Sequence, residues 1–253
     1  MTFFIDNHGP VDERYKFVYC ATAPEHERAA LMEEFLDLPV HGRDWRQHNV
    51  PKGPRAVYAL TSPDGLRWEG KPRLLLTHIS DTDTAVTYNE TYGRYLMYTR
   101  LFNFERREIA LTVSDDFWRW TPIRPLVWQD PDAGLNTDIY TNGYSQYPGQ
   151  PEYHLLFPMV YNRTDQRSSI YLHSSPDGLR WYRVPAGPVL EPGEPGAWDS
   201  EYIYVPNISS PWATNWPCPT TARPTRINTQ AFLRCSPPGA RPGLGGPRGG
   251  CAR

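Results

Sequence analysis

Acidic residues recur where the sequence changes from loop to strand. Asp138 is the clearest case, because the segment 136–142 around it is unusually polar for the start of a buried strand. Carboxyl groups that a fold brings together can act as general acid and base, one protonated and one ionised. The alternative is that they are turn caps or solvated loop acids. The candidates are Asp6, Asp83 (or its neighbour Asp81), Asp138, and Glu201 (or its neighbour Asp199).

A short pattern, Ser-x-Asp-x-x-x-Trp, occurs three times and organises the chain. Its copies begin at Ser62, Ser114 and Ser175, 52 and 61 residues apart. A supersecondary unit that recurs at such an interval indicates a repeat architecture. Ser and Asp side chains hold turns by bonding to the local backbone, so we assign these residues to the scaffold rather than to chemistry. Phe117 replaces the Gly of the other two copies, and we expect the middle turn to differ.

The elements around the repeats are predicted to be mostly strands. Alternating runs precede each copy, and each unit is expected to be an antiparallel meander of about four strands. The exception is the segment 25–38, which is rich in Ala, Leu, Met and Glu, follows Pro24, and predicts one short helix. The predicted fold class is all-β: an incomplete propeller of about three to four blades, with one helix in an N-terminal insertion.

Composition narrows the partners. The formal net charge of −2 over 253 residues gives no footprint for nucleic acid or for an acidic membrane surface, so neither is expected as a partner. No run approaches the ~20 apolar residues of a membrane span, and the first residues turn polar too soon for a signal peptide. The four Cys lack zinc spacing and no His triad is present, so no metal site and no cofactor are predicted.

The order of these segments matches a known arrangement. It runs from Asp6 through Arg14-Tyr-Lys16, the first Asp turn and Asp83 to the strand 95–100, then to 137–140 and the last Asp turn. This order resembles the five-bladed β-propeller glycoside hydrolases. The nearest likeness is to proteins similar to the N-terminal domain of glycoside hydrolase family 32, near family 43, over about residues 1–209.

The resemblance implies a funnel at the propeller axis with acidic residues from successive blades. Their implied roles are nucleophile or base, transition-state stabiliser, and general acid at a glycosidic bond. Arg100 is expected to brace an axial carboxylate, although an exposed strand-end Arg is the plainer reading. Tyr140 and Trp198 are expected to contact a carbohydrate, with packing between blades as the alternative. The candidate catalytic residues are Asp83, Asp138, Glu201 and Asp6.

The chain also departs from the family. The Trp-Met-Asn-Asp-Pro-Asn-Gly and Glu-Cys motifs are absent, and Arg-Asp-Pro is replaced by Thr82-Asp83-Thr84. Three hypotheses therefore stay open: a glycosidase acting on an oligosaccharide, an inactive carbohydrate-binding propeller or truncated fragment, and a propeller that binds something else. The glycan and the oligomeric state are left open.

Two regions are predicted along the chain. Residues 1–210 form the partial propeller, which falls short of five blades and is expected to be truncated. Residues 211–253 are rich in Pro, Gly and Arg and contain no acidic residue. Such a segment is typical of a disordered tail, and a frameshift near residue 210 is the competing explanation.

Overall fold

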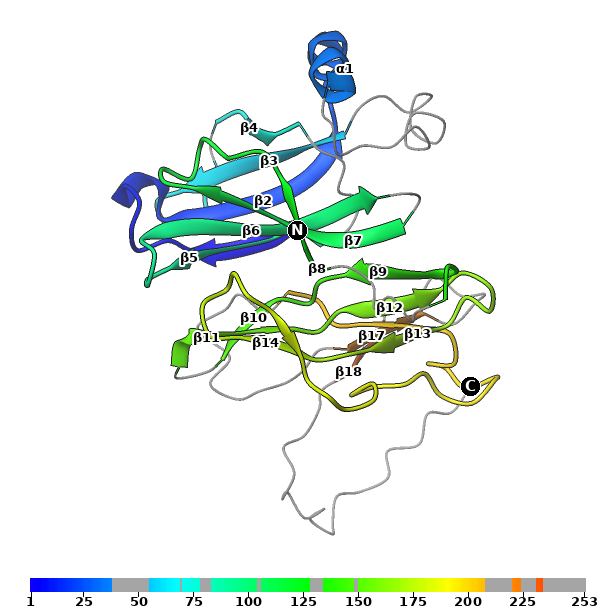
Figure 1. Cartoon of the computed structure of the whole chain (residues 1–253). Helices are drawn as coiled ribbons and strands as arrows, with labels where there is room; N and C mark the ends of the chain where they lie inside the picture. Colours follow the sequence, from blue (N-terminus) through cyan, green and yellow to red (C-terminus); the bar gives the residue numbers. More distant parts are fainter. Residues whose placement is uncertain are drawn as a thin grey trace, which may run out of the picture.

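The protein is described by a computed structural model. It covers residues 1–37, 55–68, 70–77, 83–103, 106–127, 134–147, 150–207, 220–223 and 231–233. Antiparallel sheets follow one another in chain order and lie as a stack, with the helix α1 at one extreme (Figure 1). The described chain is therefore all-β apart from short helical segments, and it has the incomplete propeller fold that the repeats predict.

Blades 1 and 2 are regular four-stranded meanders, with strand orders β1-β2-β3-β4 and β5-β6-β7-β8. The insertion between β2 and β3 carries α1, where the sequence predicts a helix. Blade 1 contains β1 (Thr2–Ile5), η1 (Val11–Glu13), β2 (Tyr15–Thr22), η2 (Glu25–Glu27), α1 (Arg28–Asp37), β3 (Arg55–Ser62) and β4 (Arg73–Leu76). Blade 2 contains β5 (Ala85–Asn89), β6 (Arg94–Asn103), β7 (Arg106–Ser114) and β8 (Arg124–Val127).

Blade 3 is bent, because its strands break midway and form two sheets, β13-β12-β9 and β10-β11-β14-β15. Pro158 stands at one break, where it has no N–H for a ladder. Gly143 has φ 55 at another, and a Cβ there would lie 2.7 Å from the carbonyl of Phe157. The strands are β9 (Thr137–Thr141), β10 (Ser145–Tyr147), β11 (Gln150–Leu156), β12 (Met159–Asn162), β13 (Ser168–Ile170), β14 (His173–Ser175) and β15 (Tyr182–Arg183).

Blade 4 consists of β16 (Tyr202–Tyr204), β17 (Thr220–Arg223) and β18 (Ala231–Leu233), paired in that order. β17 and β18 fall within the segment 211–253, for which the sequence predicts no strand. That expectation does not hold for these seven residues. The rest of the segment lies outside the described residues, so a domain boundary at residue 210 stays a prediction.

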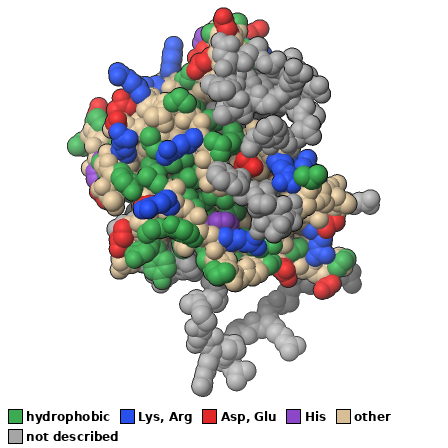
Figure 2. All heavy atoms as spheres, viewed as in Figure 1, with side chains coloured by type: hydrophobic (Ala, Val, Ile, Leu, Met, Phe, Trp, Pro, Cys, Tyr) green, Lys and Arg blue, Asp and Glu red, His purple; other side chains and the backbone are tan. Residues whose placement is uncertain are grey.

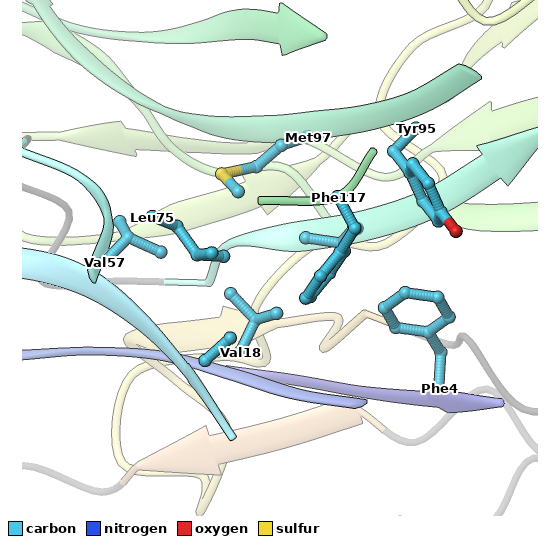
Figure 3. Packing of buried hydrophobic residues seen from close by; sticks show 9 residues of the cluster. Phe4, Val18, Val57, Leu75, Tyr95, Met97 and Phe117 are labelled. Atoms are coloured by element: carbon cyan, nitrogen blue, oxygen red, sulfur yellow. The ribbon is translucent and has the colours of Figure 1, made fainter. Parts of the chain in front are cut away.

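The hydrophobic core lies between successive blades. Phe4, Val18 and Val57 from blade 1 meet Tyr95 and Phe117 from blade 2, and their side chains point toward one another (Figure 3). A second cluster joins blades 2 and 3, and a third joins blades 3 and 4. Because each blade buries a face against the next, the stack fixes which strand ends lie side by side.

The three Asp turns share the hydrogen bond between their Ser and Asp side chains. In each, the Ser hydroxyl donates to the Asp carboxylate, at 3.1, 3.2 and 3.0 Å from first copy to last. The backbone of the middle turn follows the others, since φ is 70° at Phe117, 74° at Gly65 and 73° at Gly178. A side chain in this left-handed region costs roughly 1–2 kcal/mol. Burial of the Phe117 ring, which is 1% exposed, offsets that cost.

The difference expected of the middle turn lies in its hydrogen bonds. Trp68 and Trp181 donate from Nε1 to the carbonyls of Gly65 and Gly178, whereas Nε1 of Trp120 is buried without a partner among the described residues.

Strand direction gives the stack two ends. β3 runs parallel to β1 because both pair antiparallel with β2, and β7 likewise runs parallel to β5. The Asp turns that follow β3 and β7 therefore lie where β1 and β5 finish. We call this the turn end, and we call the opposite end, where β1, β5, β9 and β16 begin, the start end.

Candidate functional site

Asp6 lies at the turn end. β1 ends before it, so the expectation that Asp6 opens an innermost strand is wrong. Its Oδ2 accepts from the Tyr95 hydroxyl at 2.7 Å and lies 3.2 Å from Lys16 Nζ, with both side chains buried. Its Oδ1 accepts from the backbone N–H groups of His8 at 2.9 Å and Gly9 at 3.2 Å. These contacts hold the turn between β1 and β2. Asp6 is therefore separate from the side chains that gather around Tyr140 at the start end.

Asp83 lies at the start end, two residues before the first residue of β5. Its side chain is 21% exposed, and the amino nitrogen of Met1 lies 3.6 Å from its Oδ1. Its Oδ2 is buried and has no hydrogen-bond partner among the described residues. Burial raises the pKa of Asp83, while the Met1 amino group and then Arg100 oppose that rise. The carboxyl group therefore holds its proton to a higher pH than an exposed aspartate does.

Tyr140 on β9 is the centre of the cluster. Arg100, buried on β6, donates from Nη2 to the carbonyl of Tyr140 at 2.7 Å, and its guanidinium carbon lies 4.3 Å from the Tyr140 ring centroid. Arg107 lies 4.9 Å from the same centroid. The rings of Tyr161 and Tyr202 approach Tyr140 edge-on, at 5.5 and 5.8 Å between centroids. Side chains from blades 2, 3 and 4 therefore meet at one ring.

Asp138 lies two residues before Tyr140 and is fully buried. The backbone N–H of Arg107 donates to its Oδ1 at 3.0 Å, and Arg107 Nη1 donates to its Oδ2 at 2.7 Å. Arg163 Nε lies 3.6 Å from the same Oδ2. Two guanidinium groups thus balance the charge that a buried carboxylate requires. This arrangement positions Arg107 beside the Tyr140 ring.

Glu201 and Trp198 belong to the approach to blade 4. Glu201 is half-buried and directly precedes β16, and its carbonyl accepts from the N–H of Ser168 at 3.0 Å. The next residue is Tyr202, whose ring reaches Tyr140; burial and then Tyr140 raise the pKa of its hydroxyl. Trp198 is 43% exposed in the preceding loop. Glu201 is therefore linked along the chain to the cluster around Tyr140, whereas Trp198 has no ring contact with it among the described residues.

Sequence reasoning missed three members of the cluster: Arg107, Tyr161 and Tyr202. Each reaches Tyr140 or Asp138 across strands, and no motif marks them. The one signal was the acid–aromatic pairing of Glu201 with Tyr202, which parallels that of Asp138 with Tyr140.

Basic and acidic side chains are interspersed on the face of the molecule in Figure 2. Within the described ranges, His, Cys, Asp and Glu side chains form no group of three that could hold a metal ion. In the same part of the chain, no helix has the length and apolar character needed to cross a membrane.

Comparisons with known proteins support the fold. No family model matches the sequence, and no curated protein matches it either. A family 117 glycoside hydrolase from the marine bacterium Zobellia galactanivorans is similar in structure, with a TM-score of 0.53 and 13% identity over 91% of this chain and 63% of that one. At this identity the likeness shows the fold alone.

Two further structures are more distant. The β-1,2-mannobiose phosphorylase from Listeria innocua gives a TM-score of 0.48 at 15% identity, covering 73% of this chain and 50% of that one. An N-acetylgalactosamine deacetylase from F. plautii gives 0.46 at 16% identity, covering 62% and 52%. The chain thus spans about half the length of these two proteins. No comparison singles out family 32 or 43, and the chain is similar in fold to propeller proteins that include glycoside hydrolases.

Proposed function

We propose that the start end of the blades is a glycoside-hydrolase-type site that binds an oligosaccharide and protonates its glycosidic oxygen from Asp83. One observation carries the proposal. Asp83 is a half-buried carboxyl group with a raised pKa and with a buried Oδ2 that has no partner among the described residues. Glycosidases need one carboxylic acid kept protonated near an ionised one, and burial is how proteins arrange it.

The proposed hydrolysis uses two carboxyl groups and one water molecule. Asp83 gives its proton to the glycosidic oxygen as the bond to the anomeric carbon breaks. Glu201, half-buried at the start of blade 4, serves as the base or nucleophile. Water supplies the hydroxyl group that ends on the anomeric carbon, and its proton restores the acid. Both carboxyl groups thus return to their starting states.

Substrate binding is assigned to Arg100, Tyr140 and Trp198. Arg100 donates a hydrogen bond to the carbonyl of Tyr140, and its charge opposes the rise in the pKa of Asp83. Arg100 therefore interacts both with the proposed acid and with a residue proposed to bind the substrate. Trp198 is 43% exposed and offers an aromatic face to a sugar ring. Asp138 acts as a positioning residue through Arg107, because its own oxygens are buried.

The test is hydrolysis of chromogenic arabinosides, xylosides and fructosides by the full chain and by Asp83→Asn. We expect kcat to fall by about 10²–10⁴-fold, with a smaller loss for substrates whose leaving group needs no proton. In the unmodified chain, kcat falls as pH rises through the pKa of Asp83. Asp12→Asn, an exposed acid in η1, is the matched control. An unchanged rate in Asp83→Asn contradicts the assignment.

A second candidate is an inactive propeller that binds carbohydrate. It is favoured by the complete burial of Asp138 and by its pairing with Arg107, which withdraw one expected acid from the substrate. Calorimetric binding of an oligosaccharide without turnover of any substrate identifies this function. If the chain shows neither binding nor turnover, the propeller is expected to bind a partner that is not a carbohydrate.

A further inference from the structure

A cleft of about 600 Å³ lies between blades 2 and 3 at the turn end. This places it at the opposite end of the blades from Asp83 and Tyr140. Its size falls in the range of small-molecule sites, and it combines apolar side chains with a few polar groups. The lining includes Tyr92, Arg94, Leu96, Val113, Arg124 and Leu179.

The junction between blades 1 and 2 shows what occupies the equivalent place. Arg73 pairs with Ala59, three residues before the first Asp turn, and Arg124 pairs with Leu111, three residues before the second. The two arginines are therefore equivalent in the repeat. By the same count from the Asp of each turn, Trp118 in blade 2 corresponds to Leu179 in blade 3.

At the first junction the arginine is covered by a ring and balanced by a carboxylate. The guanidinium carbon of Arg73 lies 3.5 Å from the centroid of the Trp118 ring. Trp118 Nε1 donates to Glu13 Oε2 at 3.0 Å, and Glu13 Oε1 lies 3.8 Å from Arg73 Nη1. Ring, guanidinium and carboxylate thus form one unit.

At the second junction that unit is incomplete. Leu179 supplies no ring, and the exposed Arg124 has no ion pair or aromatic contact among the described residues. Gly178 is in no position to supply a ring either, since a Cβ there would lie 2.8 Å from the Tyr98 hydroxyl. Arg94 is already paired, with its Nε 2.8 Å from Asp115. The cleft therefore leaves one cation without the ring and the carboxylate that its equivalent has.

We propose that this cleft binds a small planar aromatic carboxylate. Its ring stacks on Arg124 as Trp118 stacks on Arg73, and its carboxylate takes the part of Glu13 against that arginine. The apolar side chains of Leu96, Val113 and Leu179 contact the ring edge. The site is separate from the proposed glycosidase site, so either can fail without the other.

The experiment titrates the full chain with indole-3-propionate by calorimetry. We expect binding that weakens at least tenfold with 3-propylindole, which lacks the carboxylate, and with cyclohexanepropionate, whose ring is neither aromatic nor planar. Arg124→Ala should lower the affinity at least tenfold, whereas Arg67→Ala, an exposed arginine in the first Asp turn, should leave it unchanged.

A complementary variant fills the cleft from within. Leu179→Trp places the missing ring over Arg124, so we expect it to abolish binding of indole-3-propionate and to raise Tm. Binding that survives in both Leu179→Trp and Arg124→Ala overturns the proposal, as does an absence of binding at millimolar probe in the unmodified chain. Because Arg124 is exposed, Arg124→Ala is expected to fold even if Leu179→Trp does not.

Discussion

Phe117 holds a left-handed backbone conformation inside the core, and two substitutions separate these two properties. Phe117→Ala removes the ring but keeps a Cβ at φ 70, whereas Phe117→Gly removes both the ring and the steric cost. In the middle of a strand or helix, Gly in place of Ala lowers the free energy of unfolding by roughly 0.5–1 kcal/mol. At this position we expect the order to reverse.

The magnitude follows from the surroundings of the ring. It is 1% exposed, packs edge-on against Phe4 and Tyr95 at 6.1 and 5.5 Å, and has the Lys16 ammonium 4.4 Å from its centroid. Deleting a buried Phe ring costs about 3–5 kcal/mol. Relief of the left-handed strain returns about 1–2 kcal/mol to the Gly variant, and its backbone entropy takes back about 0.5–1. Phe117→Gly should therefore be more stable than Phe117→Ala by up to about 1.5 kcal/mol.

The assay is unfolding in urea, monitored by circular dichroism. The free energies are compared with one common value of m, the slope of the free energy of unfolding against urea concentration, for all variants. Gly65→Ala is the control, because φ there is 74 and a Cβ would lie 2.8 Å from the Tyr15 ring; it should lose stability with no ring removed. If Phe117→Ala proves more stable than Phe117→Gly, the middle turn does not have the conformation described. A loss below about 1 kcal/mol in both would show that the ring is not in the core.

Two further predictions concern buried ionisable groups. Asp6→Asn leaves the buried Lys16 without its buried carboxylate partner, and only the more exposed Glu13 remains, 3.8 Å away. The free energy of unfolding, measured in urea, should fall by about 3 kcal/mol; a neutral result contradicts the buried pair. Burial lowers the pKa of His154 to about 4 from 6.5, so its neutral form stabilises the fold fully above pH 6.5 and that stability is lost as pH falls toward 4. The loss amounts to at most about 3 kcal/mol. His154→Gln should flatten this pH dependence of Tm, and an unchanged slope would refute it.

The fold could be predicted from local patterns because the repeat is built from local interactions. The Ser and Asp side chains of each turn bond to backbone groups two or three residues away, which the motif itself encodes. The backbone of the middle turn was not predictable locally, because Phe at positive φ is unfavourable by itself and is stabilised by packing against Phe4 of blade 1 and Tyr95 of blade 2. The bend of blade 3 had a signal that went unused. Pro158 falls inside the largely apolar segment 153–161, and a proline within such a strand-like segment argues for a break.

The site was predictable only as far as it follows strand starts. Asp83 and Asp138 lie near the start end because each precedes or opens a first strand. Their partners were not predictable, because Arg107 reaches Asp138 across a blade junction whose register no local pattern sets. The raised pKa of Asp83 likewise depends on burial in the folded chain.

The error at Asp6 shows that register identifies equivalent residues better than chemical type does. Tyr15 pairs with the first Ser of one Asp turn and Tyr95 with that of the next, so β2 and β6 align residue by residue. On this alignment Asp6 corresponds to Asn89, and the Oδ1 of each accepts backbone N–H groups in the following turn. The repeat register therefore indicates that Asp6 holds a turn, whereas its acidic side chain alone suggested a catalytic role.

In the same alignment Cys20 of β2 is equivalent to Arg100 of β6, because each lies five residues after the aligned tyrosine of its strand. A cysteine supplies no guanidinium, so the first blade lacks the contact that Arg100 makes with Tyr140. The start end therefore differs between blades 1 and 2, whereas at the turn end the hydrogen bond between Ser and Asp recurs in three blades. A scaffold needs identical turns, but a site that binds one ligand on the axis needs unlike residues from each blade. This asymmetry is why chemistry is better sought at the start end than at the motif that organises the chain.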